Sequence, residues 1–130
     1  MSYYFQQTVK KGFDATFLAV TEALKNEGFG MPSDINMTEI FKNKLAVDFK
    51  KYRVIGACVP QFAIKAITAD DHVGLLLPCN VVVSEIDNNN TNVYTINPEH
   101  TLIIAGIKEL EEAAKIVGEK LKKVLETLAS

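Results

Sequence analysis

The segment that decides the fold is VVVSEIDNNNTNVYTI, residues 81–96. Its two arms, Val81–Ile86 and Thr91–Ile96, are rich in residues that favour pleated strands. Between them lies Asp87-Asn88-Asn89-Asn90, whose side chains tolerate the left-handed backbone of tight turns. The segment therefore predicts a β-hairpin, whose two strands pair antiparallel.

Four further stretches predict strands. Pro32 makes the second of them an irregular or edge strand, because proline cannot donate to a ladder. The third ends at Pro60, which can open a helix at its first position. The four stretches are Tyr3–Val9, Phe29–Met37, Tyr52–Val59 and Val73–Leu77.

Apolar residues that recur at three and four positions predict four helices. Asp14 is the expected cap of the first helix and Gly28 its left-handed stop, while Thr38 is the expected cap of the second. A connecting segment through Gly106 precedes the last helix, which is long and amphipathic. The apolar faces are Phe13–Leu24, then Ile40, Phe41 and Leu45, then Phe62–Ile67, and finally Leu110–Leu128.

This order of elements predicts an α+β fold, a two-layer sandwich with a mainly antiparallel sheet covered by helices on one face. The 130 residues, 48% hydrophobic and 23% charged, suit a single domain spanning residues 1–130.

Charge and hydropathy exclude two classes of partner. The net charge is −2 and the 14 Lys and Arg are scattered, so we expect no nucleic acid partner. The longest apolar stretch, Val73–Val83, is interrupted by Pro78 and Asn80, so we expect no membrane span. The first residues lack a secretory signal, and Cys58 and Cys79 are too far apart for a C-x-x-C pair. We therefore expect a cytoplasmic protein with reduced thiols.

Five residues form the candidate ligand-binding site: Cys58, Pro60, Pro78, Cys79 and Asn80. Each cysteine lies at the end of a predicted strand near a proline, where a rigid sheet can present a group to a ligand. The alternative is that both cysteines are small buried apolar residues and that Asn80 satisfies irregular backbone.

Catalytic residues and metal ligands are not assigned, and the sequence identifies no cofactor. The nucleophile elbow, the phosphate-binding glycine loop, the H-E-x-x-H helix and the dinucleotide fingerprint are all missing. A zinc site would require His72 and His100 to converge on the cysteines, which their spacing does not predict.

Two stretches carry a family resemblance, Cys58-Val59-Pro60 and Leu75-Leu76-Leu77-Pro78-Cys79-Asn80-Val81-Val82-Val83. Together with Gly28-Phe29-Gly30, Lys42–Leu45 and Asn97-Pro98, they resemble the family called domain of unknown function 302. The resemblance implies a compact α+β sandwich, often a dimer, with no settled activity. This chain departs from the family at Val59, where asparagine is usual, and near Asp34 and Asn36, where only one carboxylate of an acidic pair remains.

These observations lead to the hypothesis of a small ligand-binding or interaction module, a homodimer without catalytic activity. One alternative is a thiol- or metal-dependent enzyme that uses Cys79 and Cys58. Another is a structural partner that docks through its final helix. The site depends on one condition: the turns beginning at Val59 and Leu77 must lie close together.

Overall fold

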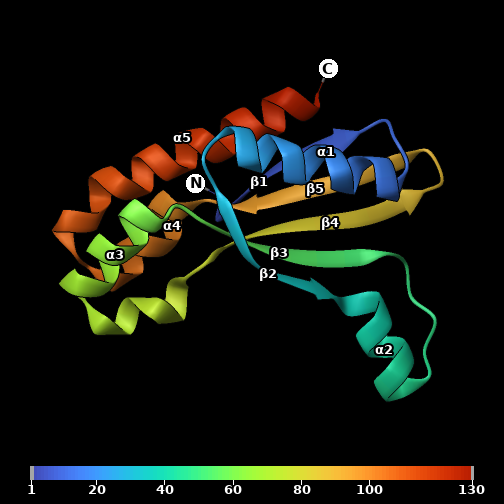
Figure 1. The fold of residues 1–130 in the computed structure, drawn as a ribbon, viewed down its shortest axis with the longest axis horizontal. Helices are drawn as coiled ribbons and strands as arrows, with labels where there is room; N and C mark the ends of the chain where they lie inside the picture. Colours follow the sequence, from blue (N-terminus) through green and yellow to red (C-terminus); the bar gives the residue numbers. More distant parts are fainter. Residues whose placement is uncertain (1, 130) are drawn as a thin grey trace.

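The computed structural model describes residues 2–129 and contains one five-stranded antiparallel sheet with helices packed on one face (Figure 1). The strands are β1 (Tyr4–Val9), β2 (Gly30–Asn36), β3 (Tyr52–Cys58), β4 (Cys79–Asp87) and β5 (Asn90–Ile96), in the order β1-β5-β4-β3-β2. The helices are α1 (Phe13–Asn26), α2 (Met37–Leu45), α3 (Pro60–Ala69), α4 (Pro98–Leu102) and α5 (Glu111–Leu128). Three 3₁₀ turns are η1 (Asp71–Leu76), η2 (Ile103–Ala105) and η3 (Lys108–Leu110). The predicted α+β sandwich is confirmed.

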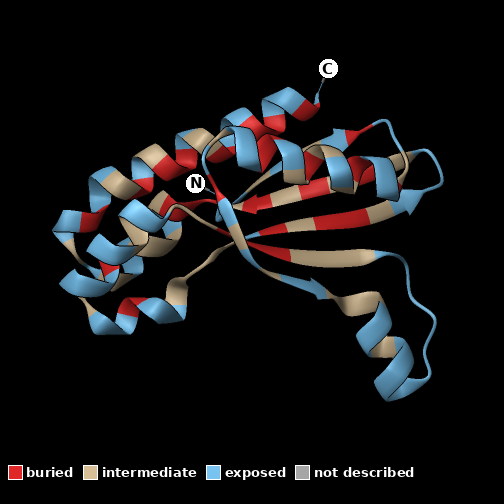
Figure 2. Cartoon of the chain, in the orientation of Figure 1, coloured by how far each residue is buried: buried red, intermediate tan, exposed pale blue. Residues whose placement is uncertain are grey.

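The main core lies between the sheet and the helices α1 and α5. Alternate strand residues, such as Val81, Val83 and Val93, point to this side and are fully buried. They pack in one cluster with Leu24 of α1 and Leu121 of α5. Figure 2 shows the buried residues along the strands and on the inner sides of the two helices. Removing this apolar surface from water stabilises the fold.

The predicted hairpin is β4 and β5. Val83 lies opposite Val93, and the two strands run antiparallel. At the turn, the Asp87 carboxylate accepts hydrogen bonds from the Asn89 backbone N–H (2.8 Å) and from Nδ2 of Asn90 (3.0 Å). These bonds also lower the pKa of Asp87, because they stabilise its charged form.

The predicted strand Val73–Leu77 is wrong, because most of this stretch is the 3₁₀ helix η1. The Asp70 side chain accepts a hydrogen bond from the His72 N–H (3.0 Å), which starts the turn. Val73 is then buried in a second small cluster with Ala66 and Leu110. Val73 is thus covered by helices and not by strand pairing, whereas Leu75 is 87% exposed.

Two of the three predicted helix signals differ from the observed ends. Gly28 adopts the expected left-handed backbone (φ 86°) after α1. The N-cap of α1 is Gly12, however, and Asp14 lies inside the first turn. The cap of α2 is the side chain of Asn36, not Thr38, because Thr38 binds the Lys50 and Tyr52 backbone.

The segment expected to connect the hairpin with the last helix contains α4 and two 3₁₀ turns. Pro98 occupies the first turn of α4, where its missing N–H costs no helical hydrogen bond. Gly106 has a left-handed backbone (φ 67°) and ends η2. This segment packs beside α3 at one end of the sheet and closes that end of the core.

Candidate functional site

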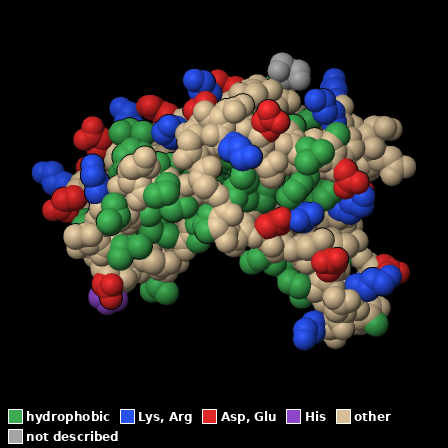
Figure 3. Space-filling view, in the orientation of Figure 1, with side chains coloured by type: hydrophobic (Ala, Val, Ile, Leu, Met, Phe, Trp, Pro, Cys, Tyr) green, Lys and Arg blue, Asp and Glu red, His purple; other side chains and the backbone are tan. Residues whose placement is uncertain are grey.

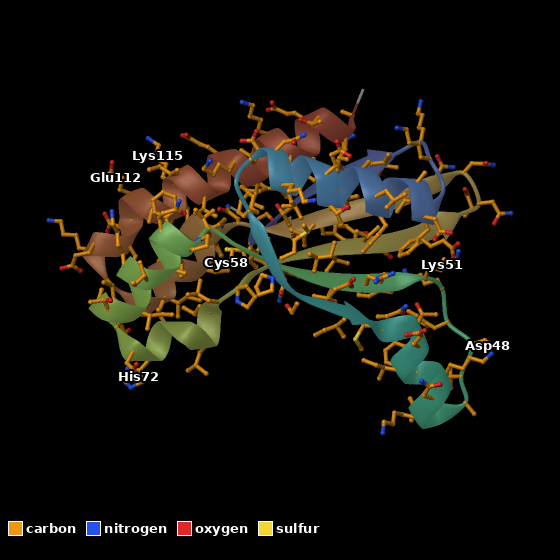
Figure 4. All side chains as sticks on the ribbon, in the orientation of Figure 1. Asp48, Lys51, Cys58, His72, Glu112 and Lys115 are labelled. Carbon is orange, nitrogen blue, oxygen red and sulfur yellow. The ribbon has the colours of Figure 1, made fainter. Side chains whose placement is uncertain are left out.

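The two cysteines lie on adjacent strands at one end of the sheet. Cys58 is the last residue of β3 and Cys79 is the first residue of β4. Cys79 lies opposite Ala57, so the two cysteines are diagonal neighbours in the ladder. Figure 4 shows Cys58 where β3 leaves the sheet towards α3. The turns beginning at Val59 and Leu77 are therefore close together, but the alternation of β3 points Cys58 to the face of the sheet opposite Ala57 and Cys79.

Both cysteines line one small cavity of about 40 Å³. The two cysteines are the only lining residues whose side chains contain an atom other than carbon or hydrogen. Among the described residues, both cysteines are free thiols and partly buried. The remaining lining residues are Phe29, Ala57, Val59, Phe62, Ala63, Ala66, Leu77, Pro78, Pro98, Leu102, Leu110, Ala113 and Val117. The lining of the cavity is thus apolar apart from these two residues.

Burial changes the acidity of both thiols. It raises the pKa of Cys58. Burial and the nearby charge of ionised Cys58 raise the pKa of Cys79 to about 11. At neutral pH both groups are therefore protonated, whereas the nucleophilic form of cysteine is the thiolate.

Pro78 packs directly on the sheet because Gly56 has no side chain in the way. A Cβ added to Gly56 would lie 2.6 Å from Cγ of Pro78 and would also overlap Oγ of Ser33. Such distances do not occur between real atoms, so Gly56 is required for the close approach of β2, β3 and the residue before Cys79.

Three of the five predicted site residues line the cavity: Cys58, Pro78 and Cys79. Pro60 is exposed and begins α3, the role that its position after a strand predicted. Asn80 is exposed and lies between Cys79 and Val81 in β4, so its side chain points to the opposite face of the sheet. The amide of Asn80 is therefore separated from the Cys79 thiol by the sheet.

The face of the sheet that carries Asn80 has no helix over it. The sequence analysis did not predict that tyrosines gather on this face. All four tyrosines of the chain line one hollow of about 410 Å³ on this face, with Asn80, Val82, Thr95 and Ile96. Tyr4 and Tyr94 meet edge to face, with ring centroids 6.1 Å apart. The period-2 alternation of β1, β4 and β5 could have predicted this cluster. Tyr4, Val82 and Tyr94 share one side of the sheet by register.

Helix α2 projects from the sheet beyond β2 and β3 (Figure 1). None of its nine residues is buried. Phe41 contacts Phe49 in the loop that follows, with ring centroids 5.2 Å apart, but Leu45 is 65% exposed. Figure 3 shows the surface indented between this helix and the end that carries His72. The arm formed by α2 and this loop, residues 37–50, thus presents an uncovered apolar surface.

The remaining polar residues singled out by sequence have local structural partners. The Asp34 carboxylate pairs with the Arg53 guanidinium (Oδ1–Nε 3.1 Å), and Arg53 lies over the Phe17 ring at 4.1 Å. Asn36 caps α2 by accepting a hydrogen bond from the Glu39 N–H (3.2 Å). His72 is exposed and contacts Asp70 (Nδ1–Oδ1 2.9 Å), whose pKa is lowered by hydrogen bonds from His72.

Within residues 2–129, no three His, Cys, Asp or Glu side chains are grouped so that they could hold a metal ion. The apolar side of the final helix is buried within its own chain. The buried residues are Leu110, Val117, Leu121 and Leu128. This burial removes the basis for docking through that helix. None of the described helices is both long enough and apolar enough to cross a membrane.

The comparisons with known proteins agree with this architecture. No curated protein matches the chain. A solved structure, an uncharacterized conserved protein DUF302 from Bacillus stearothermophilus, is similar with a TM-score of 0.87 and 26% sequence identity. The similarity covers 98% of this chain and 99% of that chain. The family model for domain of unknown function DUF302 matches residues 5–128. The chain therefore belongs to the DUF302 family.

Proposed function

We propose that this chain is a single-domain binding module without catalytic machinery, and that its ligand site is the cavity whose lining includes Cys58 and Cys79. One observation carries the proposal. The fold brings the only two thiols of the sequence, 21 residues apart, to one apolar cavity at the end of a rigid sheet. Sites on strand ends are positioned more firmly than sites on loops.

The alternative, an enzyme in which Cys79 is the nucleophile, has weaker support. Reactive cysteines have a lowered pKa beside a cation, a histidine or a helix start. Here burial raises the pKa of both thiols, and the lining of the cavity contains no histidine, lysine or arginine. A dithiol with these properties suits binding better than nucleophilic attack.

The second part of the proposal is a homodimer that forms through the uncovered face of the sheet. By strand register, this face carries Tyr4, Val54, Val82 and Tyr94 and no charged strand residue at its centre. Tyrosine is enriched in the centres of protein interfaces, where charged residues are depleted. A large uncharged face of this kind marks a site of association.

The exposure of helix α2 also favours a homodimer. An isolated helix of fewer than about 12 residues is marginal in water. No residue of this nine-residue helix is fully buried by its own chain. The sheet face measures roughly 20 Å by 20 Å from strand spacing and length, less than the ~800 Å² per partner of a standard interface. In a symmetric dimer the arm of each copy adds the missing area.

We also propose a cytoplasmic location. Both cysteines are free thiols, and reducing compartments keep thiols in that state.

Native mass spectrometry of the protein purified without chelator tests both parts. We expect a mass of two chains and, on each chain, an added mass that disappears in Cys79→Ala. The variant His72→Ala is the matched control, because His72 lies on the surface away from the cavity. A bare monomer at every workable concentration contradicts the proposal.

A further inference from the structure

The hollow on the open face of the sheet has the size and lining of a site for an organic ligand. It measures about 410 Å³, and sites for small organic ligands measure about 300 to 1,000 Å³. Its lining consists of aromatic and aliphatic side chains with a few polar groups, and no lining residue is charged. The hollow is separate from the cavity that includes Cys79, because Asn80 points to the opposite face of the sheet.

Three tyrosine rings meet at steep angles at one side of the hollow. The rings of Tyr3 and Tyr4 have centroids 5.1 Å apart and an interplanar angle of 68°. For Tyr4 and Tyr94 the two values are 6.1 Å and 81°. Parallel rings would suit a flat ligand stacked between them, whereas rings at steep angles form the corner of a box. This arrangement suits a compact, rounded group.

The distances between the rings suit the binding of a cation. The face of an aromatic ring carries partial negative charge and attracts a cation within about 6 Å of the ring centroid. With neighbouring centroids 5.1 and 6.1 Å apart, one ion can lie within that range of all three rings. Aromatic walls of this kind bind quaternary ammonium groups. Such a group has no N–H and therefore loses no hydrogen bond when it leaves water.

The chain supplies no cation of its own to these three rings. In the described part of the chain, no Lys or Arg lies over the ring of Tyr3, Tyr4 or Tyr94. Lys50 lies 6.0 Å from the ring centroid of Tyr52, but Tyr52 is in β3, two strands away from Tyr94. The other rings with a cation of the chain over them are Phe5, Phe13, Phe17 and Phe49. The corner formed by the three tyrosines is thus open to an external cation.

The polar groups of the hollow restrict the rest of the ligand. Among the described residues, none hydrogen-bonds to the Asn80 amide or to the hydroxyl of a tyrosine in the hollow. These groups can therefore bind a neutral polar substituent, such as a hydroxyl. The lining contains no arginine or lysine to bind a carboxylate or a phosphate. The lining thus favours a ligand with one positive charge and an uncharged tail.

We propose that the hollow binds a small organic cation of the choline type, which is a quaternary ammonium group with a neutral hydroxylated tail. The rings of Tyr3, Tyr4 and Tyr94 hold the ammonium group, and the Asn80 amide binds the tail. The site is additional to the ligand cavity proposed above. A dimer formed through this face would enclose the ligand between two copies.

Isothermal titration of the full-length native protein with choline chloride tests the site. We expect one choline per chain. The neutral compound 3,3-dimethyl-1-butanol has the same shape without the charge and should bind about tenfold more weakly, because the rings attract the cation specifically. Equal binding of the two compounds, or no binding of choline, overturns the proposal. This comparison does not depend on a variant that folds.

Variants of Tyr4 test the role of the rings, because Tyr4 contacts both other rings of the corner. Tyr4→Phe keeps a ring and should bind choline nearly as the native chain does, whereas Tyr4→Leu should bind about tenfold more weakly. Leu18→Ala, on the outer side of α1, is the control and should leave the affinity unchanged. Native affinity in Tyr4→Leu would contradict the site.

Tyrosine fluorescence gives a second readout of binding. The chain has four tyrosines and no tryptophan, and all four tyrosines line the hollow. Choline should therefore change the intrinsic emission and saturate the change at the affinity found by titration. Binding without a change of emission would place choline elsewhere on the chain and overturn the proposal.

The outcomes separate this inference from the proposed function. Cys79→Ala should bind choline as the native chain does, because Cys79 lies on the other side of the sheet. Choline binding to a monomer would reject the dimer and support this site, whereas a dimer that does not bind choline would reject the site. Phosphatidylcholine vesicles carry the same ammonium group beside a phosphate. Sedimentation of the protein with these vesicles, without binding of free choline, would also overturn the proposal.

Discussion

Cys79 lies at the start of β4 among apolar side chains, and this surrounding decides its acid–base behaviour. Burial is the main cause that raises its pKa to about 11, and the charge of Cys58 adds to it. A thiol whose pKa is higher in the folded chain than in the unfolded chain stabilises the fold below the unfolded value. That stabilisation is lost as the pH rises through the folded value.

The first prediction follows from this linkage. Between pH 9 and 11 the native protein should lose roughly 2 to 3 kcal/mol of unfolding free energy through Cys79. In urea unfolding, Cys79→Ala should lose less unfolding free energy than the native protein between pH 9 and 11. Titration of lysine and tyrosine affects both proteins equally, so the difference belongs to Cys79. Equal pH dependence of the two proteins would show that Cys79 titrates normally. At pH 8, alkylation of Cys79 should be slower than that of a free model thiol.

The second prediction concerns Gly56, which lies under Pro78. Gly56→Ala places a methyl group against Pro78 and Ser33, and overpacking of this kind costs about 1 to 3 kcal/mol. Gly74→Ala is the matched control, because an added Cβ there meets nothing within 4 Å. Chemical denaturation of the two variants should separate them, and equal stability would mean that the Pro78 segment moves freely.

At the scale of elements, α5 provides a large part of the main core. Leu121 and Val124 are fully buried against the sheet and α1. The polar side of the helix also contributes, since Nζ of Lys120 donates to the Glu27 carbonyl (3.0 Å) and Lys123 pairs with the Glu27 carboxylate (3.8 Å). These contacts fix α5 beside the end of α1.

The third prediction tests the burial of α5. Leu121→Ala should lower the unfolding free energy by about 2 to 5 kcal/mol, because it leaves a cavity in a closely packed core. Leu18→Ala on the outer side of α1, where Leu18 is 67% exposed, should change it by less than about 0.5 kcal/mol. Thermal and urea unfolding both measure the difference. A small effect of Leu121→Ala would place α5 outside the core.

At the scale of the whole molecule, one layer of helices leaves one face of the sheet open. The strand residues at the centre of that face are uncharged and include three of the four tyrosines: Tyr4, Tyr52 and Tyr94. The arm formed by residues 37–50 extends from the same sheet, and no residue of its helix is buried. Both features suit the symmetric partner proposed above.

The fourth prediction tests that partner. Val82→Lys puts a charge at the centre of the open face and should convert the dimer to a monomer, because burial of an unpaired charge is costly. Leu18→Lys, on the helix-covered side, should remain a dimer. Light scattering after size-exclusion chromatography measures the mass of each. A native protein that is already monomeric, or dimeric Val82→Lys, would reject this interface.

The sequence alone predicted most elements and the family, because these depend on local signals. The hairpin of residues 81–96, the left-handed stop at Gly28 and the helix opened by Pro60 each follow from a few neighbouring residues. The run Val73–Leu77 was wrongly predicted as a strand, because an apolar run can be buried either by strand pairing or by packing on helices. Its contacts with Ala66 and Leu110, which are distant in sequence, favour packing.

The tertiary structure decided the composition of the site. Strand register brings Cys58 and Cys79 to neighbouring strand ends and turns Asn80 to the face opposite Cys79, and no spacing along the chain contains that register. It also gathers Tyr3, Tyr4, Tyr52 and Tyr94 from three strands and the residue before the first. Local propensity acts within a few residues, whereas cavities and faces arise from segments that meet only after folding.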